Sequence, residues 1–168
     1  MNIALFGPSG SGKTTVANYL VSSHGYVICS SGDSCRRVCR LLFDSESKTL
    51  LNKVTDAMKS IDNTVWLKAA LANKPPNSLI VFDSMRFLYD YDYLRNERFI
   101  MWRIDAPLNI RTKRLQLRGQ EFNPSIDSLH PAETELDKHD PDYIINNNTA
   151  NIDKLYEMIE QGLSLYYT

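Results

Sequence analysis

Residues 7–14 read GPSGSGKT and match the pattern G-x-x-x-x-G-K-[ST] at every position. A short apolar stretch, Ile3–Phe6, precedes this loop, and Lys13–Ser23 follows it with the apolar spacing of a helix. Few folds accommodate such a loop, because its backbone N–H groups and the positive end of the following helix must face one phosphate. The sequence therefore predicts an α/β domain that binds a nucleoside triphosphate.

The loop also predicts the cofactors. Lys13 is placed to reach the β and γ phosphates of ATP, and the Thr14 hydroxyl is a ligand for Mg²⁺. The glycines let the backbone wrap closely around phosphate oxygens. The predicted nucleotide-binding residues are those of the loop and the first helical turn: Gly7, Ser9, Gly10, Ser11, Gly12, Lys13, Thr14 and Thr15.

Apolar strands alternate with helical stretches along the rest of the chain. Further strands are expected at Tyr26–Cys29, Leu79–Phe82, Phe99–Ile104 and Tyr143–Ile145. Further helices are expected at Ser34–Phe43, Leu50–Ser60, Asn63–Ala72, Pro107–Arg118 and Ile152–Leu165, and Gly119–Pro141 reads as a polar loop. Continuous apolar strands between helices indicate a mainly parallel sheet covered on both faces. One domain over residues 1–168 is the resulting interpretation.

Composition excludes several classes of protein. The 168 residues hold 19 Lys and Arg against 20 Asp and Glu, an even balance that argues against binding long nucleic acid by bulk charge. No stretch approaches 18 consecutive apolar residues, so no membrane partner is expected. The three cysteines lack the spacing of a disulfide framework, and no signal peptide precedes the first strand. We expect a cytoplasmic protein that acts on small molecules.

Two polar segments follow predicted strands, where ligands bind in open α/β sheets. Asp83 ends the strand Leu79–Phe82 and could hold Mg²⁺, and Arg86 could face the same crevice. After the strand that ends at Cys29, Asp33 is either a ligand-binding carboxylate or a helix cap. Arg36 and Arg37 suit an anionic acceptor such as a monophosphate, or are solvated surface residues.

Arginines also line one face of the predicted helix that begins at Pro107. Arg111, Arg114 and Arg118 are spaced i, i+3, i+7 and therefore project from one side. Arginines that close over a transferring phosphoryl group stabilise its negative charge. A basic surface helix is the alternative interpretation.

The order of these motifs resembles the nucleoside monophosphate kinases, and more narrowly the bacteriophage-type deoxynucleoside monophosphate kinases and the related dephospho-coenzyme A kinases. The features that carry the resemblance are GPSGSGKT, the D-x-x-R-F pattern of residues 83–87, the arginine helix, HPAETELD at 130–137 and DYIINN at 142–147. The resemblance implies a three-layer P-loop kinase fold with a parallel sheet of about five strands, helices on both faces and a short lid.

The resemblance also implies roles for individual segments and residues. Residues 45–73 would form an acceptor-binding arm, and residues 111–140 the lid region. Catalytic roles would fall to Lys13, Asp33, Arg111, Arg114 and Arg118, and the adenine would lie near Asn146 and the segment after it. The expected substrate-binding residues are Asp33, Arg36, Arg37, Trp66, Arg86 and Glu133, and the expected metal ligands are Thr14 and Asp83.

The implied reaction is transfer of the ATP γ-phosphoryl group to a (deoxy)nucleoside monophosphate, with Mg²⁺ present. One alternative is a kinase for an alcohol, such as dephospho-coenzyme A or a hydroxyl of a nucleoside or nucleic acid, with Asp33 as the general base. The other is a nucleotide-binding switch without turnover. A small-molecule nucleotide is the expected partner, and a homodimer is compatible with the sequence.

Overall fold

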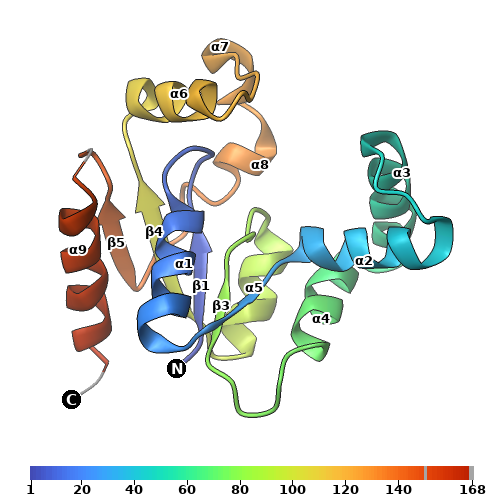
Figure 1. The fold of residues 1–168 in the computed structure, drawn as a ribbon, viewed down its shortest axis with the longest axis horizontal. Helices are drawn as coiled ribbons and strands as arrows, with labels where there is room; N and C mark the ends of the chain where they lie inside the picture. The colour runs from blue at the N-terminus through green and yellow to red at the C-terminus, as the bar shows by residue number, and fades with distance from the viewer. Residues whose placement is uncertain (150, 167–168) are drawn as a thin grey trace.

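A parallel sheet of five strands forms the centre of the computed structural model, which describes residues 1–149 and 151–166 (Figure 1). The strands are β1 (Ile3–Phe6), β2 (Val27–Cys29), β3 (Ile80–Phe82), β4 (Ile100–Asp105) and β5 (Tyr143–Asn146), in the order β2-β3-β1-β4-β5. Each neighbouring pair is parallel. The predicted α/β class and strand number are confirmed.

Helices connect the strands and cover both faces of the sheet. The helices are α1 (Lys13–His24), α2 (Ser31–Phe43), α3 (Lys48–Lys59), α4 (Val65–Ala72), α5 (Leu88–Asn96), α6 (Leu108–Leu117), α7 (Pro124–Asp127), α8 (Pro131–Thr134) and α9 (Ile152–Ser164). Parallel strands require such crossover connections, which is why helices alternate with strands along the chain. No helix among the described residues is long and apolar enough to cross a membrane.

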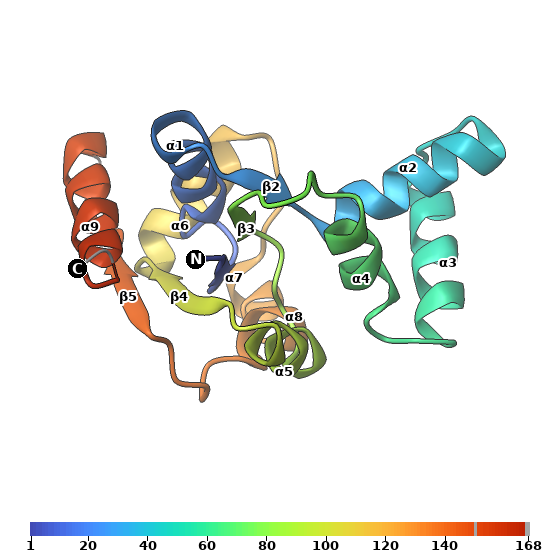
Figure 2. The same ribbon diagram turned by 90° about the horizontal axis from the view of Figure 1, so that it is seen from below.

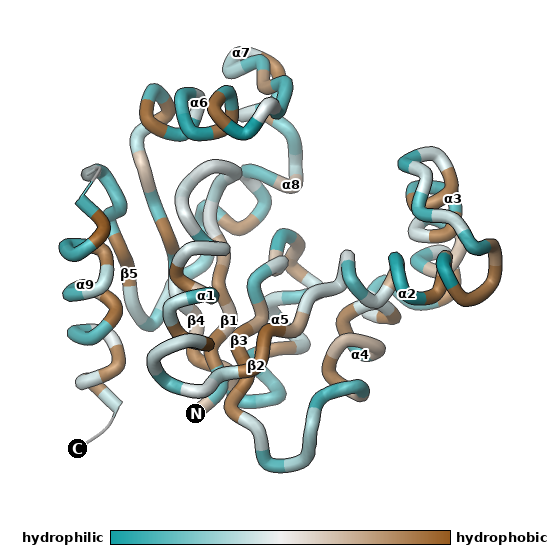
Figure 3. Tube along the Cα trace, viewed as in Figure 1, coloured by the Kyte–Doolittle hydropathy of each residue, from teal (hydrophilic) through white to brown (hydrophobic). Residues whose placement is uncertain are grey.

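Side chains alternate between the two faces of β1 and so supply two cores. Ile3 and Leu5 pack with α1 and α9 on one face, whereas Ala4 and Phe6 pack with α4 and α5 on the other. Strands β1 and β3 are hydrophobic along their length, as expected for strands buried on both sides (Figure 3). These two packed faces produce the three layers that the family resemblance implies.

Helices α2, α3 and α4 extend to one side of the sheet (Figures 1 and 2). A small core of their own, formed by Cys35, Cys39 and Trp66 against Val54 and other α3 residues, holds them together. The predicted arm, residues 45–73, comprises α3 and α4. The predicted breaks after residues 60 and 72 are close to the observed ends of these two helices.

The structure differs from the sequence interpretation mainly in residues 83–141. Helix α5 was not expected, because its sequence LYDYDYLRN is rich in Tyr and Asp, which are weak helix formers. Burial of Leu94 and capping by Asp90 support it. The predicted loop 119–141 contains the short helices α7 and α8, and α2 begins at Ser31 rather than Ser34.

Candidate active site

The GPSGSGKT loop lies between the carboxyl end of β1 and the amino end of α1, as its sequence predicts. Gly12 has φ of 114°, and a Cβ atom there would lie 2.3 Å from Asn147 Nδ2. Gly7 has φ of 123°, and a Cβ there would lie 2.2 Å from the Ile104 carbonyl oxygen. Both positions therefore need glycine for conformation and for space.

The Lys13 side chain bends back over the loop. Its ammonium group donates to the carbonyl oxygens of Gly7 at 2.6 Å and Pro8 at 3.0 Å. Burial, followed by the charge of Arg86, lowers the pKa of Lys13 from 10.5 to about 8. Lys13 is thus a buried cation at the position where a phosphate would approach.

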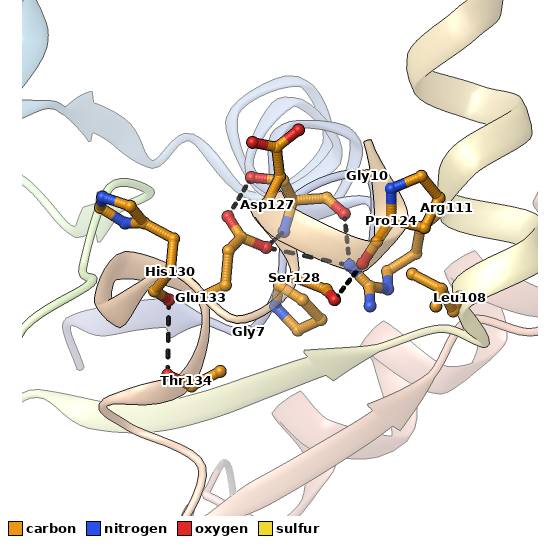
Figure 4. A network of polar contacts seen from close by, with 12 residues as sticks. Gly7, Gly10, Leu108, Arg111, Pro124, Asp127, Ser128, His130, Glu133 and Thr134 are labelled. Atoms are coloured by element: carbon orange, nitrogen blue, oxygen red, sulfur yellow. Dashed lines mark hydrogen bonds and ion pairs between the residues drawn. The ribbon is translucent and has the colours of Figure 1, made fainter. Parts of the chain in front are cut away.

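Glu133 of α8 is turned toward the same loop (Figure 4). Its carboxylate accepts from the Ser9 backbone N–H at 2.6 Å and from the Ser9 hydroxyl at 2.5 Å. Two cations lie beside it, Arg86 at 3.4 Å and Arg111 at 3.8 Å. Sequence reasoning named Glu133 as a substrate-binding residue, and the structure places it against the phosphate loop itself.

Arg111 supports the loop from α6. It is buried and donates to the carbonyl oxygens of Ala106 at 3.1 Å and Ser9 at 3.2 Å. Figure 4 shows its guanidinium group between the loop and Glu133, with a dashed line to each. Although it was predicted as catalytic, Arg111 lies behind the loop and is placed to shape it.

Arg114, one turn further along α6, supports the second half of the loop. It donates to the carbonyl oxygens of Gly10 at 3.4 Å, Ser11 at 3.3 Å and Thr149 at 3.1 Å, and to Asn147 Oδ1 at 3.2 Å. Burial and the neighbouring Arg118 lower the pKa of Arg114. These contacts tie α6 and the segment after β5 to the loop.

Arg118 differs from the other two arginines of α6. Its side chain has no hydrogen-bond or ion-pair partner among residues 1–149 and 151–166, and it lines two cavities beside the loop. A guanidinium with five free donors is suited to a phosphate.

A cavity of about 250 Å³ lies directly over the loop, and we name it the loop cavity. Its polar lining joins residues that the sequence had singled out separately: Ser9, Gly10, Gly12, Lys13, Thr14, Asp83, Arg86 and Arg118. Four separate segments of the chain contribute to it. This cavity is the candidate phosphate site.

Asp83 is suited to help hold a magnesium ion in the loop cavity. Its Oδ1 atom is buried without a hydrogen-bond partner in the described part of the chain, and burial together with the charge of Asp33 raises the pKa of Asp83. Thr14 lines the same cavity. No group of three or more His, Cys, Asp or Glu side chains converges anywhere in the described residues. One carboxylate and one hydroxyl, completed by phosphates and water, is a donor set that Mg²⁺ accepts.

Two larger cavities adjoin the loop cavity on opposite sides. The α6–α9 cavity, about 390 Å³, shares Gly12 and Arg118 with it. The α6–α9 cavity is also lined by Thr15, Arg114, Asn147, Thr149 and Leu155.

The arm cavity, about 290 Å³, shares Ser30, Ser84 and Arg86 with the loop cavity. Its deeper lining comes from the arm and from α5, and includes Thr55, Lys59, Asn63, Trp66, Phe87 and Asp90. Trp66, which sequence reasoning assigned to the substrate site, lies here. Three neighbouring cavities that share lining residues thus lie at the carboxyl ends of the strands.

The basic residues of α2 are only partly brought to these cavities. Asp33 and Arg36 pair with each other at 2.8 Å, are largely exposed, and line neither the loop cavity nor the arm cavity. Arg37 lines a separate cavity with Val38 and Ala69. Consecutive helical residues point in different directions, so Arg36 and Arg37 could not both face one site.

Asn146 and Asn147, at the end of β5 and directly after it, face different surroundings. Asn146 is exposed and lines a depression with Asp105 and Pro107, outside the α6–α9 cavity. Asn147 is buried, lines the α6–α9 cavity, and donates from Nδ2 to the Ser11 carbonyl oxygen at 2.7 Å. The sequence prediction covered Asn147 only as part of the segment after Asn146; the alternation of side chains along a strand is the signal that could have singled it out.

A glycine-rich loop after the central strand, followed by a helix and flanked by arginines, defines a P-loop protein with a kinase fold. A family model described as an AAA domain matches residues 3–153, so the chain belongs to that family. By family and by fold, the protein is a P-loop kinase.

Individual relatives agree with this class. The chain is 24% identical to a protein of Acanthamoeba polyphaga mimivirus whose name proposes deoxynucleotide monophosphate kinase activity, over 94% of this chain and 93% of the relative. It is 25% identical to an adenylate kinase of Malacoplasma penetrans, over 100% of this chain and 80% of the relative. Among solved structures, a shikimate kinase of Acinetobacter baumannii in complex with shikimate superposes with a TM-score of 0.62 and 20% identity, over 99% and 95% of the two chains. That similarity shows the shared fold.

Proposed function

We propose that the protein transfers the γ-phosphoryl group of ATP to a nucleoside monophosphate, such as a deoxynucleotide. The observation that carries the proposal is that the loop cavity lies between two larger cavities and shares cationic side chains with both. Arg118 is common to the loop and α6–α9 cavities, and Arg86 to the loop and arm cavities. Two nucleotides placed with their phosphates at the centre fit this arrangement.

The α6–α9 cavity is the proposed donor site. The phosphates of ATP bind at Lys13 and along the loop, and its adenine lies toward Asn147 and Thr149. Arg118 has no competing partner among the residues that the structure describes, so it is free to stabilise the charge on the transferring group. Thr14 and Asp83 would hold Mg²⁺, which when bound offsets the negative charge of the phosphates.

The arm cavity is the proposed acceptor site, with Arg86 at its junction with the loop cavity. An oxygen of the acceptor phosphate forms the new bond to the γ phosphorus, and the bond from that phosphorus to the β–γ bridging oxygen breaks, leaving ADP. The second pKa of a phosphate monoester is about 6, so the attacking oxygen needs no general base at neutral pH. Orientation and charge stabilisation supply the catalysis.

The placement of Asp33 favours this reaction over transfer to an alcohol. An alcohol acceptor needs a base within hydrogen-bond reach. Asp33 was the sequence candidate for that base, but it is exposed, paired with Arg36 at 2.8 Å, and absent from the lining of both cavities. We therefore expect Asp33→Asn to leave kcat nearly unchanged, with any effect confined to the KM for the acceptor or to which nucleobase is accepted. A kcat loss of several orders of magnitude would favour the alcohol kinase.

The first experiment measures ADP release from ATP and Mg²⁺ with each ribo- and deoxynucleoside monophosphate, and with dephospho-coenzyme A. We expect turnover of about 1–100 s⁻¹ with one or a few monophosphates. Turnover with dephospho-coenzyme A alone would overturn the proposal in favour of an alcohol kinase. ATP binding with no acceptor-dependent turnover would instead indicate a nucleotide-binding switch.

A matched pair of variants then tests the acceptor site. Arg86→Ala removes the cation at the cavity junction and is expected to raise the KM for the monophosphate by roughly 100-fold, the value of a charge-assisted hydrogen bond left unmade. Arg37→Ala removes a cation that lies in a different cavity. The KM of this variant for the monophosphate should therefore stay within about twofold of the wild-type value. Equal effects of the two substitutions would contradict the assignment.

A further inference from the structure

The carboxylate of Glu133 occupies a position with an unusual set of partners. Only 8% of its side chain is exposed, and all of its polar contacts are donors: the Ser9 N–H, the Ser9 hydroxyl, Arg86 and Arg111. Its charge also reaches the buried ammonium of Lys13, whose pKa it raises against the larger effect of burial. Backbone N–H groups of a glycine-rich loop, guanidinium groups and an ammonium are the groups that bind phosphate.

A phosphate and this carboxylate cannot share those donors. Both are anions, and because only 8% of the Glu133 side chain is exposed, their repulsion exceeds what the same distance would give in solvent. Each Ser9 donor can also serve only one strong acceptor. A terminal phosphate that enters the loop at Ser9 must therefore displace Glu133.

We propose that Glu133 holds the place of the terminal phosphate in the nucleotide-free protein and that its displacement couples the two substrate sites. This inference rests on the proposed function for the acceptor site, but its nucleotide part depends only on the phosphate loop. Glu133 is thus a positioning residue for the loop and for Arg86, and it competes with the γ phosphate of the donor.

Arg86 provides the coupling. It contacts Glu133 at 3.4 Å and lines both the loop cavity and the arm cavity. An acceptor phosphate that engages Arg86 takes one cation away from Glu133, which makes the carboxylate easier to displace. The acceptor therefore strengthens ATP binding, and ATP must strengthen acceptor binding by the same factor.

The segment that carries Glu133 is built to allow a local movement. Helix α8 is a single short turn, and apart from the contacts of Glu133 itself the chain is anchored just beyond that residue. Glu135 accepts from the Leu88 N–H at 2.7 Å, Leu136 is buried, and Asp137 pairs with Arg103 at 2.9 Å. Residues 135–137 can stay packed while the Glu133 side chain leaves the loop.

Comparing two nucleotides tests the competition directly. ADP lacks the γ phosphate, whereas the non-hydrolysable analogue AMPPNP carries a phosphoryl group at that position. For Glu133→Gln, titration calorimetry with Mg²⁺ should show AMPPNP binding at least about 10-fold tighter than in the wild type, since a charge-assisted competitor is removed. ADP affinity should change less than about threefold. Glu133→Asp keeps the charge on a shorter side chain, so its AMPPNP affinity should lie between those of the wild type and Glu133→Gln.

Glu135→Gln is the matched control, because Glu135 lies two residues away, accepts the Leu88 N–H, and has no hydrogen bond or ion pair to residues 7–14 in the described structure. It should leave the ratio of ADP to AMPPNP affinity unchanged. If Glu133→Gln weakens the binding of ADP and AMPPNP equally, Glu133 only shapes the loop and the proposed competition is wrong. An unchanged ratio overturns the proposal as well, and retained ADP binding shows that the variant is folded.

The coupling is measured by repeating the AMPPNP titration with saturating dAMP, dCMP, dGMP or dTMP. In the wild type, at least one should tighten AMPPNP binding, and Glu133→Gln should reduce that effect to less than about twofold. Monophosphate turnover without any such tightening would overturn the coupling. Absence of turnover with every monophosphate would refute the proposed function, while the comparison of ADP with AMPPNP would still decide the role of Glu133.

Discussion

Single residues at the phosphate loop are held in states that a bound phosphate would change. Burial, and then the charge of Arg86, lowers the pKa of Lys13 to about 8. The Lys13 ammonium donates to two carbonyl oxygens of the loop itself. Asp83 has the reverse shift, because burial and the charge of Asp33 raise its pKa. An anion bound in the loop cavity would favour the charged form of Lys13.

Nucleotide binding should therefore weaken as the pH rises above about 8. Above its pKa of about 8, Lys13 is mainly neutral in the free protein and must take up a proton when phosphate binds. The dissociation constant for ADP should be flat below that pH and rise above it, approaching about tenfold per pH unit. Calorimetry in buffers of different ionisation enthalpy should detect uptake of nearly one proton at pH 9. A constant affinity from pH 7 to 9.5 without proton uptake would refute this.

At the scale of elements, the site depends on how closely α6 and α9 approach the sheet. Helix α9 packs on β4 and β5 through Gly162, where a Cβ atom would lie 2.6 Å from Tyr143 Cε1 and 2.9 Å from Trp102 Cη2. The other end of α9 supplies Ile152 and Leu155 to the α6–α9 cavity. A shift of α9 would thus change both stability and the proposed donor site.

Gly162→Ala should destabilise the protein by roughly 2 kcal/mol, because the overpacking against two aromatic rings exceeds the gain in helix propensity of about 1 kcal/mol. Urea unfolding measures the change through the transition midpoint. Gln161→Ala is the control, since Gln161 is exposed on the same helix and its substitution should shift stability by less than about 0.5 kcal/mol. A midpoint for Gly162→Ala at or above that of the wild type would be inconsistent with this packing.

At the scale of the whole molecule, the three cavities form one line across the carboxyl edge of the sheet. The α6–α9 cavity, the loop cavity and the arm cavity are joined by Arg118 and Arg86, which come from different segments. Excluding water from such a line is necessary if ATP is not to be hydrolysed before the acceptor arrives. We expect residues 111–140 to act as the lid, with Arg118 drawn in by the bound phosphates.

Limited proteolysis tests this closure, because trypsin can cleave after the exposed Arg118. A bisubstrate analogue in which two nucleosides are joined by a chain of five phosphates should slow that cleavage by roughly 10-fold or more, as expected for a site sequestered from solvent. ADP alone should slow it much less, since it fills one cavity only. Cleavage at the same rate with and without the bisubstrate analogue would exclude the closure.

The sequence predicted the parts of this protein that depend on local interactions. The conformation of residues 7–14 follows from its glycines and from the strand and helix on either side, so GPSGSGKT predicted both structure and ligand class. The five strands were recognisable as short apolar runs, most clearly β1 and β3, which are buried on both faces and therefore lack polar alternation. Helix α5 was missed because its Tyr and Asp residues favour a helix only once Leu94 is buried and Asp90 caps it.

Tertiary structure decided which side chains share a site. The sequence predicted the same role for Arg36 and Arg37, but helix geometry directs the two side chains to different places. The sequence named Asn146, whereas the alternation along β5 places Asn147 in the α6–α9 cavity. The contact between Glu133 and Ser9 joins residues 124 positions apart, a distance over which no local pattern carries information. The amino-acid sequence by itself therefore determined the phosphate loop, the sheet and the class of enzyme, since each rests on neighbouring residues. The packing of distant segments decided which arginines contact the loop and placed the Glu133 carboxylate against Ser9.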